Sequence, residues 1–318
     1  MTRFNLTSVL SCAALMFSAA GSTQAQATRT WVSGVGDDAN PCSRTAPCKT
    51  FAGTMSKTAA GGEINCIDPG GFGTVSINKS IAIICDNTEA GVLTNGTNGI
   101  SINAGATDII YLSGLDIEGL NTSSPTGVNF IAGGALHIRN STIRGFTNGV
   151  NFAPSAGIPE LYITNSTIAD NGPSGLGNGV LIAPTGAAAI VATLQGVKLL
   201  NNHTGIQASS AGTTGIVTVA IRDSDVSGNT SGAGVFAQGA AGKGPVTIVV
   251  DSSTVSQNQQ GLFAYNAANA VVIVGRSVIT GNGLGFYQVN GGLTQSYGDN
   301  DATGNLTLGT ISPGGAHQ

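Results

Sequence analysis

The chain has 318 residues, of which 48 are glycine and only 9% are charged, against roughly a quarter in typical soluble domains. Because 41% of the residues are hydrophobic, the chain can bury apolar surface, which low-complexity disordered chains cannot do. A formal charge of -4 and an aromatic content of 5% argue against nucleic acid as a partner. Valine, isoleucine, threonine, serine, asparagine and glycine dominate, which is typical of strands joined by tight turns.

Residues 1–27 have the pattern of a secretory signal peptide. A basic start at Arg3 precedes an apolar run over residues 9–20, and Ala25-Gln26-Ala27 supplies the small–x–small cleavage pattern. The apolar run is too short to span a bilayer, so we expect no membrane span in the mature chain. A lipoprotein signal at Cys12 is disfavoured because the apolar run continues beyond it. The sequence therefore predicts a secreted or periplasmic protein.

The mature chain divides into three parts. Residues 28–62 predict an N-terminal strand and a short capping helix around residues 49–60. Phe51 and Met55 lie four residues apart, on one helical face, and Gly61 suits the helix C-cap. Residues 63–295 form the repeat region, and residues 296–318 a C-terminal cap and tail. Such caps protect the open ends of a repeat array from end-to-end pairing.

Four cysteines remain after removal of the signal peptide, and export permits disulfides. Cys42, Cys48, Cys66 and Cys85 allow three pairings. We favour Cys42–Cys48, which closes a small loop, and Cys66–Cys85, which lie in two similar segments. If those segments stack on successive coils, their backbones lie about 4.8 Å apart, within the range for a disulfide. The alternative is a stacked pair of free buried thiols.

A repeat of 22 to 30 residues is the strongest feature of the sequence. Each copy has a glycine before an apolar–x–apolar triplet, and the eight glycines are Gly99, Gly127, Gly149, Gly179, Gly205, Gly234, Gly261 and Gly285. A second unit lies between them, as in residues 136–143 and 161–168. Alternation of period two points Ile138 and Ile143 inward, with a bend between them. Strands this short bury a face only when coils stack on one another, which predicts an all-β solenoid. An antiparallel sandwich is the main competing fold, and the near-constant period disfavours it.

Two polar residue types recur at fixed places in the repeat. The serines are Ser141, Ser166, Ser224, Ser253 and Ser277. The asparagines are Asn171, Asn202, Asn229, Asn258 and Asn282. A row of asparagines could bind sugar, but asparagine suits left-handed turns and bonds backbone groups there. We therefore interpret these asparagines as an internal structural ladder.

The segment after the signal peptide resembles the opening of right-handed β-helix proteins related to pectate lyases and periplasmic NosD-type proteins. The likeness lies in Trp31-Val32-Ser33-Gly34-Val35-Gly36-Asp37-Asp38-Ala39-Asn40-Pro41, in residues 47–51, in residues 61–64 and in Pro69-Gly70-Gly71-Phe72. The resemblance implies a single-stranded right-handed parallel β-helix over the mature chain, with a short N-terminal capping helix. It is specific for fold and only weakly specific for function.

Charged residues that point outward are candidates for chemistry. The densest cluster is Lys198, Arg222, Asp223, Asp225 and Asp251. In a polysaccharide lyase or epimerase acting by β-elimination, Lys198 or Arg222 would be the base. Asp223, Asp225 and Asp251 would hold Ca²⁺. The alternative, which we favour, is that Arg222–Asp251 and Lys198–Asp225 are ordinary ion pairs between coils.

Other enzyme classes fit the sequence poorly. The carboxylate motifs of polygalacturonase-type hydrolases do not occur in it. The three histidines, His137, His203 and His317, are scattered, which disfavours a histidine metal site or a catalytic triad. The sequence favours a non-catalytic exported protein without a cofactor that binds a polysaccharide or cell-surface component, or serves as an adhesive or structural module. The alternative is a lyase or epimerase for acidic polysaccharide, with Ca²⁺ as a possible cofactor.

Overall fold

The computed structural model describes residues 26–121, 125–173, 175–267 and 269–314. The predicted signal peptide thus lies almost entirely outside the described residues. Within the described ranges, no helix is long and apolar enough to cross a membrane.

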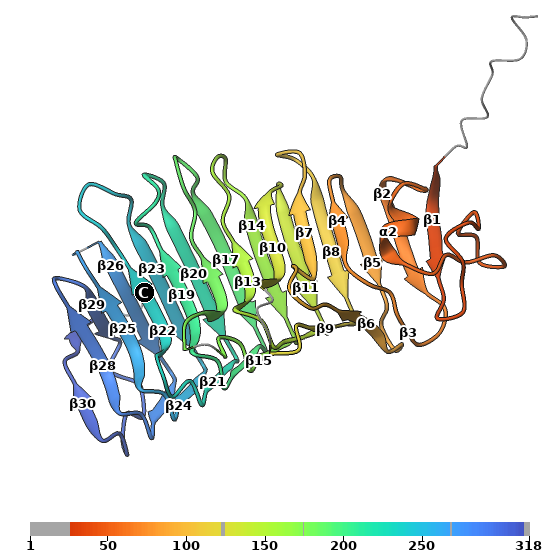
Figure 1. The fold of residues 1–318 in the computed structure, drawn as a ribbon. Helices are drawn as coiled ribbons and strands as arrows, with labels where there is room; N and C mark the ends of the chain where they lie inside the picture. The colour runs from red at the N-terminus through yellow and green to blue at the C-terminus, as the bar shows by residue number, and fades with distance from the viewer. Residues whose placement is uncertain (1–25, 122–124, 174, 268, 315–318) are drawn as a thin grey trace, which may run out of the picture.

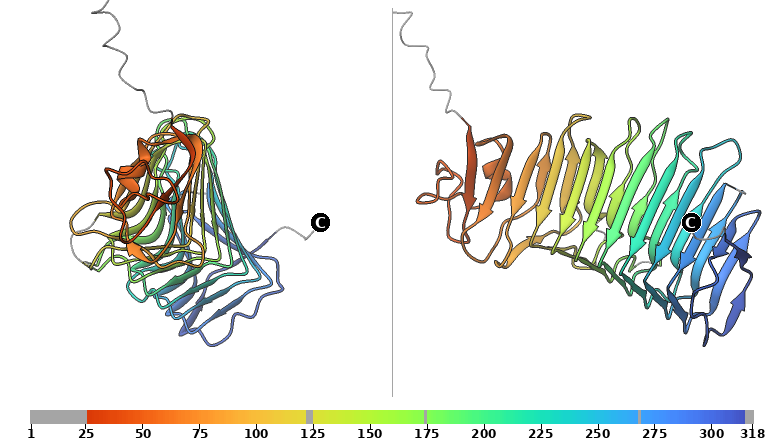
Figure 2. Two further views of the ribbon diagram at one scale, coloured as in Figure 1. Left: turned by 90° about the vertical axis from the view of Figure 1, so that its right-hand side faces the viewer. Right: turned by 180° about the vertical axis from the view of Figure 1, so that it is seen from behind.

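The chain winds into an elongated β-helix of stacked coils, with β1 at one end and β30 at the other (Figure 1). Each coil contributes one strand to each of three parallel sheets, here called sheets I, II and III in chain order. Seen from the end, successive coils overlie one another (Figure 2). Sheet II has nine strands, so the solenoid has about nine turns. The predicted all-β fold, a right-handed parallel β-helix, is confirmed.

The strands have the following bounds. Sheet I contains β1 (Ala27–Val32), β2 (Thr58–Cys66), β5 (Ile81–Ile84), β8 (Ile109–Ser113), β11 (Ala135–Arg139), β14 (Glu160–Thr164), β17 (Ile190–Gln195), β20 (Val217–Arg222), β23 (Val246–Asp251), β26 (Ala270–Gly275), β29 (Leu293–Ser296) and β31 (Ser312–Pro313). Sheet II contains β3 (Gly70–Gly71), β6 (Ala90–Leu93), β9 (Leu115–Glu118), β12 (Thr142–Arg144), β15 (Thr167–Ala169), β18 (Lys198–Leu200), β21 (Asp225–Ser227), β24 (Thr254–Ser256) and β27 (Val278–Thr280). Sheet III contains β4 (Val75–Ile77), β7 (Ile100–Asn103), β10 (Thr126–Ala132), β13 (Asn148–Phe152), β16 (Asn178–Ile182), β19 (Thr204–Ser209), β22 (Ala233–Gln238), β25 (Gln260–Tyr265), β28 (Leu284–Val289) and β30 (Thr307–Gly309).

The core consists of aliphatic side chains stacked in columns. In β20, Val217, Val219 and Ile221 are buried and the residues between them point outward. Ile221 pairs with Leu194 on one neighbouring coil and with Val250 on the other, and all three are fully buried. Burial of one such side chain stabilises the fold by about 1.5–3 kcal/mol relative to exposure. Stacking thus gives each short strand the core that it cannot form alone.

The recurring glycine before each apolar–x–apolar triplet has a packing cause. A Cβ on Gly149 would lie 2.6 Å from the carbonyl oxygen of Gly179 and 3.0 Å from the Nδ2 atom of Asn171. A Cβ on Gly179 would lie 2.6 Å from the carbonyl oxygen of Gly205. Real Cβ contacts are longer, so glycine alone fits where successive coils approach this closely.

The capping helix is shorter than the sequence analysis predicts. Helix α2 spans Phe51–Met55, with Thr50 as N-cap and Ser56 as C-cap. The prediction of Gly61 as C-cap is wrong, because β2 already begins at Thr58 and includes Gly61 with φ +73°. The Thr58 hydroxyl donates to the Thr54 carbonyl and lies in the core, which ends the helix early.

Both predicted disulfides are present. Cys42 pairs with Cys48 at a Cα–Cα distance of 4.7 Å, and Cys66 pairs with Cys85 at 5.0 Å. The second bond joins β2 to the coil that follows, where Asn65 and Ile84 are register partners. This disulfide therefore cross-links two successive coils at the N-terminal end of the solenoid.

Candidate functional site

The asparagine column lies inside the turn between sheets II and III, and its side chains bond to one another. The Nδ2 atom of Asn171 donates to Oδ1 of Asn202 at 2.9 Å, and that of Asn229 to Oδ1 of Asn258 at 2.8 Å. From Asn202 onward, each Oδ1 also accepts the backbone N–H of the asparagine on the preceding coil, as in the Asn202–Asn229 contact of 2.9 Å, whereas Oδ1 of Asn171 accepts the N–H of Phe146. The five asparagines are buried, and their amides bond to one another and to the backbone.

Asn305 is a further member of this column that was not predicted from the sequence. Asn282 donates from Nδ2 to Oδ1 of Asn305 at 2.9 Å. Asn305 lies in the predicted C-terminal cap, where the apolar pattern of the repeat is lost. Asn305 follows Asn282 by 23 residues, an interval within the range of the repeat, and this spacing could have identified it.

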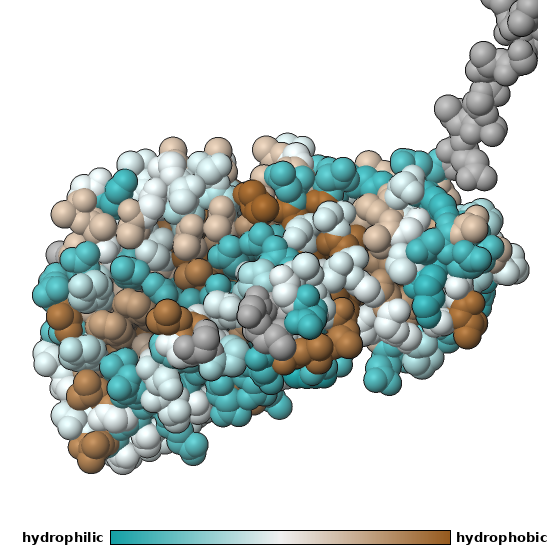
Figure 3. Space-filling model, viewed as in Figure 1, coloured by the Kyte–Doolittle hydropathy of each residue, from teal (hydrophilic) through white to brown (hydrophobic). Residues whose placement is uncertain are grey.

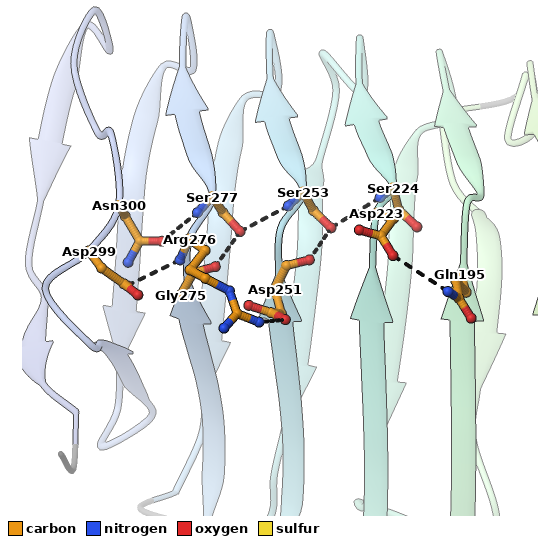
Figure 4. Close-up of polar contacts among 10 residues, drawn as sticks. All are labelled: Gln195, Asp223, Ser224, Asp251, Ser253, Gly275, Arg276, Ser277, Asp299 and Asn300. Carbon is orange, nitrogen blue, oxygen red and sulfur yellow. Dashed lines mark hydrogen bonds and ion pairs between the residues drawn. The ribbon is translucent and has the colours of Figure 1, made fainter. Parts of the chain in front are cut away.

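The serine column lies in the turn between sheets I and II (Figure 4). The Ser253 hydroxyl donates to the carbonyl of Asp251 at 2.8 Å and accepts the backbone N–H of Ser224 at 3.2 Å. The same pattern links Ser253 to Ser277, and Asn300 ends the column by accepting the Ser277 N–H at 2.9 Å. This column is also buried and holds successive coils in register.

The expected ion pairs between coils do not form, although the predicted register is correct. Arg222 and Asp251 are register partners, as are Lys198 and Asp225. The Asp251 carboxylate instead pairs with the guanidinium of Arg276, on the next turn (Figure 4). Neither Arg222 nor Lys198 belongs to an ion pair of the described residues.

Three residues of the predicted catalytic cluster share a surface depression. Lys198, Asp223 and Asp225 line a hollow of about 350 Å³ at the turn between sheets I and II. Arg222 and Asp251 do not line it. The Asp225 carboxylate accepts the Ser227 hydroxyl at 2.7 Å, and Gln195 donates to Asp223 at 3.5 Å. In the described part of the chain, no group of three or more histidine, cysteine, aspartate or glutamate residues is placed to hold a metal ion.

A larger groove, which the sequence analysis did not predict, runs beside the asparagine column. This inter-sheet groove has a volume of about 780 Å³ and lies between sheets II and III. Its floor includes the turn residues Gly145, Asp170, Asn201, Gly228 and Gln257, which follow the strands of sheet II on five successive coils. At about 4.8 Å per coil, these residues span about 19 Å.

The turn residues in the floor have left-handed backbones. The φ values are +55° at Asp170, +53° at Asn201 and +56° at Gln257, and the other two coils have glycine, with φ +76° at Gly145 and +73° at Gly228. Asparagine, aspartate and glycine tolerate this conformation best, which explains the small polar character of the floor. The side chains of Asp170, Asn201 and Gln257 are exposed.

One wall of the groove carries a charge cluster from sheet II. Arg144 donates from Nη1 to Oδ1 of Asp116 at 2.5 Å and from Nη2 to Oε2 of Glu118 at 2.9 Å. The hydrogen bond with Asp116 and the attraction of both carboxylates raise the pKa of Arg144 above its usual value. The guanidinium is therefore already committed to protein carboxylates.

A second missed feature is a stack of three rings on the outer face of sheet I. The His137 ring lies 4.4 Å from that of Tyr111 and 4.7 Å from that of Tyr162, with near-parallel planes. Burial between the two rings lowers the pKa of His137, and nearby Glu160 opposes that shift only in part. The signal in the sequence was the equivalent place of His137 and Tyr162 in the two similar units at residues 136–143 and 161–168.

The chain has structural relatives but no detected sequence relatives. No protein-family profile matches it, and no curated protein matches it significantly. Its structure is similar to that of the pectate lyase Pel9A, with a TM-score of 0.66 and 17% identity, covering 93% of this chain and 80% of that one. It is also similar to an alginate lyase from Paenibacillus sp. str. FPU-7, with a TM-score of 0.55 and 14% identity, covering 92% of this chain and 100% of that one. A rhamnogalacturonan lyase gives a TM-score of 0.50 at 16% identity, with 84% of this chain and 75% of that one covered.

Identities this low establish the fold and not the activity. The similarity to the pectate lyase Pel9A covers 93% of this chain. The chain therefore has the pectate-lyase-like right-handed parallel β-helix fold.

Proposed function

We propose that this protein is exported and binds a polysaccharide, and that the inter-sheet groove is the binding site. The shape of the groove carries the proposal. It is open and crosses five coils of a stiff solenoid, so it can hold a linear polymer in one extended conformation. A preformed site of this kind avoids much of the ordering cost of binding.

The polar side chains that line the groove can form hydrogen bonds with a polymer rich in hydroxyl groups. Its lining includes the exposed side chains of Asn121, Asn201, Thr230, Ser231 and Gln257. Within the described residues, these five side chains make no hydrogen bond to another protein group, so their donors and acceptors are available to a ligand. Over the face shown in Figure 3, hydrophilic and hydrophobic residues are interspersed.

Two further observations support a location outside the cytoplasm and a polysaccharide partner. The two disulfides, Cys42–Cys48 and Cys66–Cys85, are stable in oxidising compartments. The similar structures are named as pectate, alginate and rhamnogalacturonan lyases, so proteins named for polysaccharides use this fold.

We expect the mature chain, residues 28–318, to bind at least one member of a panel of neutral, acidic and amino-sugar polysaccharides. Isothermal titration calorimetry and affinity electrophoresis measure this. Thr230→Trp fills the groove and should weaken binding about tenfold, which corresponds to about 1.4 kcal/mol. Thr218→Trp is the matched control, because Thr218 is exposed on the outer face of sheet I.

Two results would contradict the proposal. One is that no polysaccharide of the panel binds the folded protein. The other is that Thr230→Trp binds as the unmodified protein does while Thr218→Trp loses affinity, which would move the site to sheet I.

A lyase is the second candidate, favoured by the free Lys198 amine beside two carboxylates in the smaller hollow. In that case Lys198, in its unprotonated form, removes the proton α to the uronate carboxyl group, the C–H electron pair forms the double bond, and the glycosidic oxygen leaves from the β carbon and takes up a proton from solvent. We expect uronate polymers, with or without Ca²⁺, to yield the unsaturated product measured by its ultraviolet absorbance. Lys198→Met should abolish this product, and Lys243→Met should not. Absence of product from every polymer rules this candidate out.

A further inference from the structure

We infer that the polysaccharide held in the inter-sheet groove is neutral or carries amino groups, and is not a uronate polymer. The inference rests on the proposed function and specifies its ligand class. It departs from the acidic polymers for which the similar pectate and alginate lyases are named.

Among the described residues that line the groove, the only guanidinium is already hydrogen-bonded to protein carboxylates. Arg144 contacts Asp116 through both Nη atoms, at 2.5 and 3.1 Å, and contacts Glu118 at 2.9 Å. A uronate carboxylate is best bound by a guanidinium that offers two parallel N–H donors. Here the donors of Nη1 and Nη2 face protein carboxylates, so a ligand carboxylate would have to compete with them.

The carboxylates of the groove outnumber its cations. Asp170 lies in the floor, is exposed, and takes part in no ion pair of the described residues. Among the described lining residues, Glu118 and Asp170 are two negative charges against one from Arg144, a net charge of -1 (two minus one), and Asp116, just outside the lining, pairs with the same guanidinium.

The amides and hydroxyls beside Asp170 suit a polymer without negative charge. Asn201, on the coil after Asp170, and Gln257, two coils beyond Asn201, can donate hydrogen bonds to sugar hydroxyl groups and accept hydrogen bonds from them. A ligand ammonium can form a charge-assisted hydrogen bond with the Asp170 carboxylate, whereas a ligand carboxylate is repelled by it. The formal charge of -4 on the whole chain acts in the same direction.

The test compares three forms of one sugar hexamer that differ in charge: cationic, neutral and anionic. The probes are the β-1,4-glucosamine hexamer, its N-acetylated neutral form and its N-succinylated anionic form, with a galacturonate hexamer as uronate probe. Binding to the mature protein is measured by calorimetry at pH 6.5 and low ionic strength. We expect the amino or neutral hexamer to bind at least about tenfold more tightly than either anionic probe, and added salt to weaken binding of the amino form.

Asp170→Asn is the diagnostic variant, because asparagine tolerates the left-handed turn. It should weaken binding of the amino hexamer about threefold to tenfold and leave the neutral hexamer unchanged, a selective loss expected from one charge contact. Glu89→Gln, which removes an exposed carboxylate outside the groove and outside the smaller hollow, should change neither affinity.

The outcomes separate the two proposals. Tightest binding of the succinylated or galacturonate hexamer overturns the inference and leaves the proposed function standing. An unchanged ratio of amino to neutral affinity in Asp170→Asn also overturns it. If none of the four hexamers and no polysaccharide of the wider panel binds, the proposed function itself fails.

Discussion

Replacing Asn229 with aspartate is expected to lower the free energy of unfolding by at least about 3 kcal/mol, because it puts an unpaired charge in a buried network. The Asn229 side chain is fully buried. Its Nδ2 atom donates to Oδ1 of Asn258 at 2.8 Å and to the carbonyl of Leu199 at 3.2 Å. A carboxylate at this place offers no donor, and its second oxygen would face three acceptors, the third being the Ser227 carbonyl.

Asn201→Asp is the matched control for this prediction. Asn201 is the same residue type, lies in the equivalent turn one coil earlier, and is exposed to solvent. Aspartate tolerates its left-handed backbone, so the change should stay within about 0.5 kcal/mol. Urea unfolding followed by circular dichroism gives the comparison. Equal midpoints for the two variants would show that the asparagine column contributes no more than a surface turn.

Gly205→Val is expected to prevent folding or to destabilise the protein by about 3 kcal/mol or more, at the upper end for overpacking. A Cβ at this position would lie 2.5 Å from the carbonyl oxygen of Gly234 and 2.9 Å from Cγ1 of Val226. The first contact is backbone of the adjacent strand β22, which cannot move aside without breaking its pairing with β19. The effect arises from space and not from backbone conformation, since no left-handed φ is present at Gly205.

Gly71→Ala tests the same reasoning where the surroundings are open. A Cβ on Gly71 meets no atom within 4 Å, and its backbone is not left-handed. We expect this variant to match or slightly exceed the stability of the unmodified protein. The soluble yield and the thermal unfolding temperature of Gly205→Val are compared with those of Gly71→Ala. A Gly205→Val protein that melts near the temperature of Gly71→Ala would contradict the close approach of coils.

The sequence contains enough information to predict the fold and the register. Side chains of period two and like residues in each repeat place Arg222 opposite Asp251 and Lys198 opposite Asp225, as the structure has them. The pairing of Cys66 with Cys85 follows from the same stacking. These features depend on backbone spacing, which the repeat determines.

The chemistry of the surface was not predictable to the same degree. Asp251 pairs with Arg276 and not with Arg222, because a long side chain on a left-handed turn can reach the coil beside it. The inter-sheet groove is built from single turn residues of five coils, which share no motif and become neighbours only after winding. The early end of the helix at Met55 depends on burial of Thr58, a tertiary contact that local pattern does not contain.

Hydrogen–deuterium exchange of the mature protein, with and without a bound polysaccharide, tests the central claim most directly. Groove binding should slow exchange at backbone amides in turns 170–173, 201–203 and 228–231, which line the inter-sheet groove. The outer face of sheet I and the hollow at Lys198 should be unaffected. Protection confined to residues 196–198 and 223–225, with none in the three groove turns, would contradict the account and favour a site at Lys198 instead.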